Sequence, residues 1–335
     1  MISIVAKGGS QAGDADAFRS VETPVPSPEG HDILVRIQAV SVNPVDTKVR
    51  RRTPQGQDVV LGWDACGVVE SAGSEAGIFS PGARVFYAGA LNRPGTNAQY
   101  HLVDERIVGA APKSLSAPEA AAMPLTSITA FEGLFDRLGF IPQAGANAGR
   151  SILIVGGAGG VGSMAVQLAA WAGLRVVATA SRPDTVAWCE ALGAHLVADH
   201  RQPLAKAVRD AGQDFVDAVF CTTHMEKHWE QMAEIVAPQG SVVLIDDPAG
   251  PLDITVFKSK SARICWEFMF ARSLFATPDM ARQGEILGIV AGLADAGRVR
   301  TTLRETFEGL TLENIRAAHI RQEGAGMIGK QVVVL

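Results

Sequence analysis

The sequence lacks the features that mark disulfide-rich, membrane-spanning and nucleic-acid-binding proteins. Its four cysteines are scattered and form no C-x-x-C pair, which is typical of buried thiols in a reducing compartment. No apolar run is long enough to cross a bilayer, and residues 1–7 lack the basic segment and long apolar core of a secretory signal. A net charge of −5 at pH 7 gives no reason to expect nucleic acid or a membrane surface as a partner. We therefore expect a cytoplasmic protein that acts on a small molecule.

Length and composition predict about two domains. The chain has 335 residues, against a prior of about 150 residues per domain. Its character changes near Met123, because the segments before this residue read as short strands separated by proline and glycine. Such spacing is typical of a compact, barrel-like β domain. The expected strands in this part cover residues 32–42, 65–72, 83–88 and 99–108.

The second half predicts an α/β domain. After residue 151, strands alternate with helices, which is the pattern of a parallel sheet built from βαβ units. Before it, Ser116 and Glu119 form a capping box that begins a helix, and a second helix is expected over 126–138. A helix over 279–296 and a strand over 331–335 follow the sheet. The expected strands of the sheet cover residues 152–155, 176–179, 195–198, 218–222, 241–245 and 262–270.

A glycine-rich turn follows the strand at 152–155. Gly157, Gly159 and Gly162 fit G-x-G-x-x-G, with Gly160 and Val161 between them. Glycines at these places let the backbone approach a pyrophosphate, and the next helix directs free N–H groups at its phosphates. A plain turn between two elements is the alternative. Because a strand precedes the run and a helix and second strand follow it, we predict a dinucleotide site.

The region after the second strand indicates which dinucleotide is bound. NAD sites place an Asp or Glu about 20 residues further on, to accept hydrogen bonds from the ribose 2′-OH. Here no carboxylate occurs until Asp184. The Ser181 hydroxyl and the Arg182 guanidinium can instead hydrogen-bond a 2′-phosphate and offset its charge. NADP(H) is therefore favoured over NAD(H), although the same residues can also cap the helix expected over 184–192.

The histidines do not predict a metal site. His224 and His228 would face the same way on a helix. The segment does not match H-E-x-x-H, because its acid is in the wrong place, and no third ligand accompanies the pair. We interpret them as a solvent-facing pair. His200, at the end of the third strand of the sheet, is expected either against the adenine ribose or at the surface.

Several segments besides the glycine run resemble the medium-chain dehydrogenase/reductase superfamily. The likeness is greatest to its quinone oxidoreductase branch and to a bacterial subgroup labelled zinc-type alcohol dehydrogenase-like. The resemblance implies a GroES-like β domain formed by residues 1–122 and 271–335, and a Rossmann domain formed by residues 123–270. The matching segments cover residues 41–48, 61–64, 124–127, 244–248, 266–270 and 329–330.

The resemblance also implies a catalytic site made of Asn43, Asp46, Trp63 and Asp64. Asn43 and Asp46 would lie beside the nicotinamide, and Trp63 with Phe268 would form flat apolar walls for an aromatic substrate. Each position has an ordinary structural alternative: a turn at residues 43–44, and core packing for the two aromatic rings. The further cofactor contacts that the resemblance implies are Thr126, Thr222, Ile245, Asp246 and Lys330; for Asp246 we expect the backbone to make the contact.

The positions that match catalytic-zinc ligands carry unsuitable residues. Asp46 stands where the resemblance places a cysteine, and Trp63 stands where it places a histidine. A catalytic zinc needs three N, S or O ligands, and Asp46 with Asp64 falls short of that number. Cys66, two positions after Asp64, is more typical of a small buried residue. We predict no metal.

Hydride transfer to a conjugated acceptor is the chemistry that remains. A quinone or enone delocalises the added charge and needs no Lewis acid at its oxygen. We therefore predict an NADPH-dependent reductase of quinone- or enone-like molecules. The alternatives are a zinc-dependent alcohol dehydrogenase and an NADPH-binding sensor or structural protein with negligible turnover.

A homodimer is the expected assembly. The stretch at residues 264–270 is too apolar for an exposed edge strand, and pairing with its own copy across a two-fold axis would bury it. In the alternative, the helix over 279–296 covers this stretch and the protein is a monomer.

Overall fold

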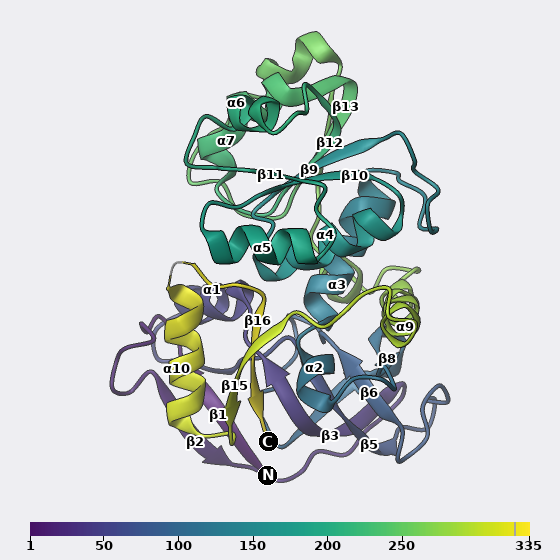
Figure 1. The fold of residues 1–335 in the computed structure, drawn as a ribbon. Coiled ribbons are helices and arrows are strands. Elements are labelled where there is room, and N and C mark those ends of the chain that lie inside the picture. The colour runs from purple at the N-terminus through teal and green to yellow at the C-terminus, as the bar shows by residue number, and fades with distance from the viewer. Residues whose placement is uncertain (325) are drawn as a thin grey trace. The chain divides into compact units, whose positions relative to one another are not determined.

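The computed structural model describes residues 1–324 and 326–335 and divides them into two compact units (Figure 1). The first unit contains residues 1–128 and 270–335, and the second contains residues 129–269. The sequence placed these boundaries after residues 122 and 270. The chain passes from the first unit into the second within helix α3 (Pro124–Phe131). In the described part of the chain, no helix is both long and apolar enough to cross a membrane.

The first unit is built on two sheets. The larger has the strand order β15-β16-β3-β5-β6-β8, with β7 paired to β3, and the smaller has the order β2-β1-β4. The C-terminal strand lies antiparallel to β3, with Val332 opposite Ser41, so the tail completes this sheet as expected. The strands are β1 (Ile2–Lys7), β2 (Phe18–Glu22), β3 (Asp32–Ser41), β4 (Asp58–Val60), β5 (Ala65–Ala72), β6 (Arg84–Tyr87), β7 (Tyr100–Asp104), β8 (Gly109–Ala110), β15 (Leu303–Glu308) and β16 (Lys330–Val334).

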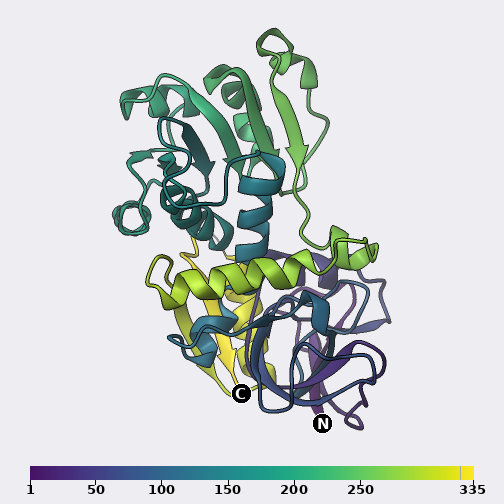
Figure 2. The same cartoon turned by 90° about the vertical axis from the view of Figure 1, so that its right-hand side faces the viewer.

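Short helices cover the strands of the first unit. Helix α9, the long yellow-green helix in Figure 2, packs against β8 and the 3₁₀ turn η1. Helix α10 packs against α1. The capping box predicted for Ser116 and Glu119 is present at the start of α2. The helices are α1 (Pro44–Arg52), η1 (Glu105–Ile107), α2 (Ala117–Ala121), α8 (Ala271–Leu274), α9 (Arg282–Asp295) and α10 (Leu312–Glu323).

The second unit is a six-stranded parallel sheet with helices on both faces. Its order, β11-β10-β9-β12-β13-β14, is that of a doubly wound dinucleotide-binding fold. Figure 1 shows the sheet edge-on, with α4 and α5 on one side and α6 and α7 on the other. The strands are β9 (Ser151–Val155), β10 (Arg175–Thr179), β11 (Leu196–Ala198), β12 (Val216–Cys221), β13 (Val236–Leu244) and β14 (Arg263–Trp266). The helices are the π-helix η2 (Glu132–Arg137), α4 (Gly160–Trp171), α5 (Pro183–Ala191), α6 (Leu204–Asp210), α7 (Met225–Ile235) and the 3₁₀ helix η3 (Ile254–Lys260).

The apolar runs that predicted the central strands are buried in this sheet. All five residues of β9 are buried, because strands of a parallel sheet are covered on both faces. Leu153 and Val219 pack in one cluster with Met225 and Trp229 of α7, which fixes that helix on the sheet. This core places the carboxyl ends of β9, β10 and β12 together at one edge, where sheets of this class bind ligands.

The expected elements are found, with corrections to several of them. The strand expected over 99–108 covers only Tyr100–Asp104, because the chain turns at η1 directly after it. The segment 262–270 forms a strand only over Arg263–Trp266, and the fifth strand ends at Leu244. The helix expected over 126–138 begins at Pro124 and changes to π-helical geometry after Phe131. The interpretation of residues 43–44 as a plain turn was wrong, because Asn43 caps helix α1.

Candidate active site

The N-terminus of α1 holds two of the expected catalytic side chains. Asn43 precedes the helix, and its backbone N–H donates a hydrogen bond to Oδ2 of Asp46 at 2.7 Å. An acid is favoured in a first turn because the first N–H groups of a helix have no partners within it. Pro44 suits the first position because its missing N–H is not needed there. Asn43 and Asp46 are 1% and 0% exposed, so both lie in the interior of the first unit.

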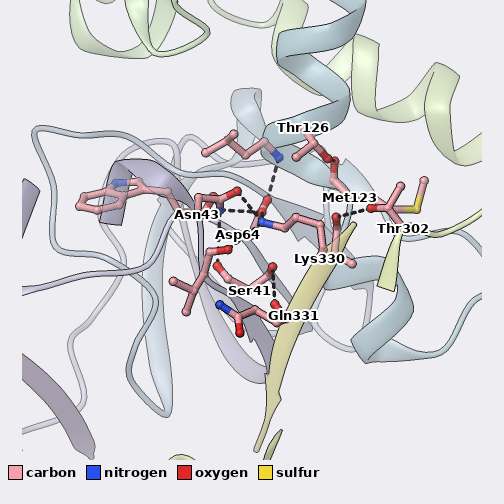
Figure 3. A network of polar contacts seen from close by, with 12 residues as sticks. Ser41, Asn43, Asp64, Met123, Thr126, Thr302, Lys330 and Gln331 are labelled. Atoms are coloured by element: carbon pink, nitrogen blue, oxygen red, sulfur yellow. Dashed lines mark hydrogen bonds and ion pairs between the residues drawn. The ribbon is translucent and has the colours of Figure 1, made fainter. Parts of the chain in front are cut away.

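Asn43 joins Asp64 and Lys330 in a buried polar network (Figure 3). The Lys330 ammonium donates hydrogen bonds to Oδ1 of Asn43 and, at 3.0 Å, to the Val42 carbonyl, and it lies 3.1 Å from Oδ2 of Asp64. Nδ2 of Asn43 donates to the same carboxylate oxygen at 2.8 Å. The other oxygen of Asp64 accepts the backbone N–H of Leu125 at 2.7 Å. Both ends of the Asn43 amide are therefore held.

The pairing of three neighbouring strands explains why these residues meet. Asn43 follows β3, Asp64 precedes β5, and Lys330 is the first residue of β16. β3 lies between the other two strands in the sheet. The Ser41 hydroxyl also donates to the Gln331 carbonyl at 2.8 Å, which holds β16 in register with β3.

Burial makes the network sensitive to charge. The side chains of Lys330 and Asp64 are 2% and 0% exposed. Burial raises the pKa of Asp64 and lowers the pKa of Lys330, while the attraction between the two groups opposes both shifts. A buried ion pair is tolerated when further hydrogen bonds satisfy both groups, as Asn43, Val42 and Leu125 do here.

Asp46 is the group in this site that titrates near neutral pH. Burial raises the pKa of its carboxyl to about 7, opposed by the Asn43 N–H and the charge of Lys330 and assisted by the charge of Asp64. Its Oδ2 accepts the Asn43 N–H, and the Gly62 backbone N–H also favours the charged form. Within residues 1–324 and 326–335 no hydrogen bond of good geometry reaches the buried Oδ1. A carboxyl whose pKa lies near the ambient pH can both hold and release a proton.

Trp63 lies in the core of the first unit. Its side chain is 1% exposed, its indole N–H donates to the Ala90 carbonyl at 3.2 Å, and its ring packs edge-on against Phe270. The alternative of core packing therefore describes Trp63. Phe268, in contrast, is 48% exposed. Thr126 is buried in the first turn of α3, where its hydroxyl donates to the Met123 carbonyl at 3.0 Å (Figure 3).

The glycine run of the second unit forms a tight turn with one open position. A Cβ on Gly162 would lie 2.1 Å from the Gly156 carbonyl oxygen, and one on Gly156 would lie 2.4 Å from Oγ1 of Thr222. A Cβ on Gly157 would crowd β10 at 2.8 Å. Gly159, the N-cap of α4, is the exception, since its nearest atom would be 3.5 Å away. The turn packs closely on the sheet and leaves room at the helix N-terminus, so its residues fit a pyrophosphate.

Arg182 and Ser181 follow β10 at the same edge of the sheet. Arg182 is the N-cap of α5, which confirms the capping alternative. Its side chain is 44% exposed and lies 3.2 Å from Oδ1 of Asp184. Ser181 lines a pocket of about 750 Å³ together with Asp199 and Arg201. The capping role leaves the Arg182 side chain at the surface, where it can reach a ligand.

The remaining cofactor candidates lie at the ends of β11, β12 and β13. His200 is exposed in the turn after β11, and Thr222 follows β12 with its hydroxyl donating to the Val155 carbonyl at 2.7 Å. Ile245 and Asp246 follow β13, and Oδ1 of Asp246 accepts the backbone N–H of Asp247 at 3.0 Å. Lys330, expected against the cofactor, is held in the network with Asn43 instead of reaching the surface.

The donor set does not fit a catalytic zinc. Among the described residues, no three His, Cys, Asp or Glu side chains are grouped so that they could hold a metal ion. Trp63 offers no ligand atom, and burial raises the pKa of the Cys66 thiol to about 11, which disfavours the thiolate that zinc binds. The Lys330 ammonium already supplies a positive charge to Asp64. The described side chains therefore provide no ligand set for a catalytic zinc.

The network contains partners that sequence patterns did not reveal. The Leu125 N–H and the Val42 carbonyl belong to the backbone, so residue types carry no signal for them. The segments at 41–48, 61–64 and 329–330 were singled out by resemblance alone, and the structure brings their side chains together.

Two family models match this chain. A model described as alcohol dehydrogenase GroES-like domain matches residues 29–126, and one described as zinc-binding dehydrogenase matches residues 160–281. A zinc-type alcohol dehydrogenase-like protein of Staphylococcus aureus is 42% identical over 320 residues, which are 96% of each chain. The human quinone oxidoreductase is 27% identical over 93% of this chain and 91% of its own.

A solved structure from Rhizobium etli CFN 42, provisionally described as a zinc-dependent alcohol dehydrogenase, has the same fold. It is 49% identical, with a TM-score of 0.95 over 100% of this chain and 98% of its own. Both units of the fold and nearly the whole sequence are therefore shared with known oxidoreductases. The chain belongs to the medium-chain dehydrogenase/reductase superfamily, in its quinone oxidoreductase-like branch.

Proposed function

We propose that this oxidoreductase is a zinc-independent, NADPH-dependent reductase of quinone- or enone-like small molecules. One observation carries the proposal: the Lys330 ammonium occupies the buried network beside Asp64, where it contributes the positive charge. No ligand set for a Lewis acid surrounds it in the described residues. Acceptors that delocalise charge by conjugation need no Lewis acid.

The proposed chemistry divides the work between a bound cofactor and the chain's own side chains. When bound, a nicotinamide cofactor supplies the hydride. Asp46 is the proton source, because its pKa of about 7 leaves it substantially protonated at neutral pH. Its Oδ2 accepts the Asn43 N–H, so the transferable proton belongs on Oδ1. Because Asp46 is 0% exposed, we propose that its proton reaches the reduced acceptor through an intervening water or hydroxyl group. The resulting carboxylate is stabilised by the Lys330 charge.

Asn43 and Lys330 act as positioning residues in this proposal. Lys330 holds the Asn43 amide oxygen and Asp64 holds its amide nitrogen, so the amide cannot rotate. Asn43 in turn holds Asp46 through its backbone N–H. Trp63, packed in the core, supports this arrangement without contacting substrate. The human quinone oxidoreductase, 27% identical, supports a quinone-like acceptor.

NADPH is the proposed hydride donor. Ser181 and Arg182 stand at the end of β10, where NAD-specific sites place an acid. The Arg182 guanidinium is at the surface, and its partner Asp184 can be exchanged for a 2′-phosphate with a stronger charge. The glycine turn with its open position at Gly159 supports pyrophosphate binding at the neighbouring strand end. Cofactor contacts at Gly160, Val161, Thr222, Ile245 and Asp246 are part of the same proposal.

A homodimer through β14 completes the proposal. β14 is the terminal strand of its sheet, and Trp266 and Phe268 are 55% and 48% exposed beside it. Helix α9, the cover in the monomer alternative, packs against β8 and η1 of the first unit. An apolar edge strand invites pairing with another chain, and a two-fold axis would pair β14 with its own copy.

Steady-state oxidation of NADPH across a panel of quinones, enones, ketones and aldehydes tests the function. The expected result is turnover of quinones or enones without added metal, and little with saturated ketones. A preference for simple alcohols or ketones that requires zinc would support the alcohol dehydrogenase alternative. Tight NADPH binding without turnover of any acceptor would indicate a sensor or structural role.

A further inference from the structure

Three histidines lie at the carboxyl edge of the second unit's sheet, and His200 among them is close enough to Arg182 to interact electrostatically with it. We call His200, His224 and His228 the histidine cluster. His200 follows β11, while His224 caps α7 and His228 lies one turn into that helix. Helices α6 and α7 pack together, and the Ala205 N–H at the start of α6 donates to Oε1 of Gln231 in α7 at 3.2 Å. This packing brings the turn after β11 to the N-terminus of α7.

The cluster lies at the same edge as the glycine turn. The segment leading into α7 begins with Thr222 and Thr223. A Cβ built on Gly156 would lie 2.4 Å from Oγ1 of Thr222 and 3.1 Å from Cγ2 of Thr223. His224 then adopts a left-handed backbone conformation, with φ of 50°, which few residues other than glycine adopt. The side chain of His224 is 59% exposed. The chain therefore turns sharply at this histidine, beside the site proposed for the dinucleotide.

The members of the cluster interact electrostatically with one another and with Arg182. Burial lowers the pKa of His200, and the positive charges of Arg201, His224 and Arg182 lower it further, opposed by Asp199. Burial also lowers the pKa of His228, with contributions from His200 and His224. Both rings are therefore neutral at pH 7 in the free protein, and each is poised to gain a proton when a negative charge arrives.

The carboxylates near the histidine cluster either pair with arginines or lie at the limit of ion-pair distance from a histidine. Asp199 pairs with Arg201 at 2.6 Å and Asp184 with Arg182 at 3.2 Å. Glu226 lies 3.9 Å from His224 and raises the pKa of His228, while Lys227 lowers it. The charges around the histidine cluster are balanced, because Arg182, Arg201 and Lys227 stand against Asp184, Asp199 and Glu226. An incoming phosphate can therefore gain a net attraction here if a histidine takes up a proton.

We propose that the histidine cluster takes up a proton when the 2′-phosphate of NADP(H) binds beside Arg182, and that it thereby sets the preference for NADP(H) over NAD(H) according to pH. The proposal rests on the NADP(H) specificity proposed above. The proton comes from solvent and goes to a ring nitrogen of His200 or His228. A phosphate that carries nearly two negative charges at pH 7 stabilises the imidazolium, and NADH has no such group.

The sign of the pH dependence follows from linkage. Binding of the phosphate raises the histidine pKa, so the complex holds more protons than the free protein and affinity for NADPH rises as pH falls. A rise of between one and two pKa units for one histidine strengthens NADPH binding about fivefold between pH 8 and pH 6.5. Below about pH 6 the affinity for NADPH stops rising, because the 2′-phosphate itself becomes protonated. Affinity for NADH stays nearly constant over the same range.

Isothermal titration calorimetry in buffers of different ionisation enthalpy measures the proton uptake directly. At pH 7 we expect uptake of roughly half a proton with NADPH and none with NADH, from the same linkage. The variant His200→Gln/His224→Gln/His228→Gln should lose the uptake and the fivefold pH effect. His31→Gln, the same change in the first unit, is the matched control and should behave as the unaltered protein. Thermal melts and the NADH affinity show whether each variant is folded.

Three outcomes separate the two proposals. If NADPH binding is accompanied by proton uptake and the triple substitution removes that uptake, the result supports the role of the histidine cluster. NADPH preference with no proton uptake, or uptake unchanged in the triple variant, overturns this inference and leaves the NADP(H) specificity standing. Equal affinity for NADPH and NADH at every pH overturns the specificity itself. Single substitutions, each measured in the same way, identify which ring gains the proton.

Discussion

Lys330 donates a hydrogen bond to the side-chain oxygen of Asn43 across 287 residues of sequence. The same ammonium lies 3.1 Å from Asp64, so one cation links the end of β3, the start of β5 and the start of β16. The amide of Asn43 has its oxygen and nitrogen assigned by this arrangement, because only the oxygen can accept from an ammonium. The Asn43 amide is therefore fully engaged within the network, and Asp46 is the proton source that we propose for this site.

Removing the Lys330 charge should destabilise the first unit strongly. Lys330→Met leaves the Asp64 carboxylate buried without its counter-charge, and loss of one partner of a buried pair costs about 3–5 kcal/mol of unfolding free energy. Denaturant unfolding measures the loss. The double variant Lys330→Met/Asp64→Asn removes both charges and should recover much of the stability. A single variant as stable as the unaltered protein would show that the pair contributes little.

Asp46 should make stability and activity depend on pH near neutrality. Its pKa is raised to about 7, so the native state binds a proton that the unfolded state releases above its ordinary pKa. The stability contributed by the protonated form is complete below pH 4 and is lost as pH rises towards 7, by about 1.4 kcal/mol per unit. The Asp46→Asn variant has no carboxyl that titrates at this position. As pH rises from 5 to 7, the unfolding free energy of the unaltered protein should therefore fall relative to that of the variant.

The same substitution tests the proton source. The kcat for quinone or enone reduction should fall above about pH 7 in the unaltered protein, following the Asp46 pKa. Asp46→Asn should lower kcat and abolish its fall above about pH 7, with little change in the affinity for NADPH. An unchanged pH profile in the variant would assign the proton to another donor.

Arg182→Ala should largely remove the preference for NADPH over NADH. Loss of one charge-assisted contact to the 2′-phosphate costs about 1.5–3 kcal/mol, which is roughly ten- to a hundredfold in affinity. Fluorescence titration with both cofactors measures the change. The affinity for NADH should be nearly unaltered, because NADH has no 2′-phosphate for Arg182 to contact. Equal affinities in the unaltered protein would refute the prediction before any substitution is made.

The purified protein should carry far less than one zinc per chain. Trp63 and Asp46 stand at the matched ligand positions, and the Lys330 charge disfavours a second cation beside Asp64. Elemental analysis and activity after chelation test this directly. Stoichiometric zinc, with activity lost on chelation and restored by the metal, would contradict the proposed chemistry.

Light scattering should give a mass near twice the 35.2 kDa of one chain at micromolar concentration. Phe268→Asp should shift the protein towards the monomer, because it places a charge beside the paired edge strands. Asp279→Asn, an exposed change in the first unit, serves as the control. A mass near that of one chain for the unaltered protein would mean that β14 does not pair with its copy.

The second unit was largely predictable from sequence, and the active-site network was not. The strand at 151–155, the glycine run and the following helix are consecutive, so local pattern and turn chemistry specify them. Helix α1 has no apolar stripe: its Arg50 is buried by partners on α10, where it contacts Nδ1 of His319 at 2.8 Å and pairs with Glu323. Such contacts join residues some 270 positions apart, and no local pattern encodes them.

The same limit applies to Lys330. A lysine at the start of a strand is expected at the surface, since lysine is rarely buried without a partner. Its partners Asn43 and Asp64 flank β3 and β5, strands that join β16 in one sheet only when the chain has folded. Resemblance to a family singled out all three segments, but residue chemistry alone gave no reason to place an ammonium among them.

The position of β16 has a consequence for how the chain acquires its structure during synthesis. β16 occupies an interior place in its sheet, between β15 and β3, and it follows the other strands of that sheet in the sequence. The second unit is complete in sequence by residue 269 and can fold while the remainder is being translated. The first unit has to wait with a gap beside β3, an open strand edge that chaperones or neighbouring nascent chains can engage. The Lys330 network therefore cannot assemble until residues 330–334 have been synthesised and β16 has paired with β3.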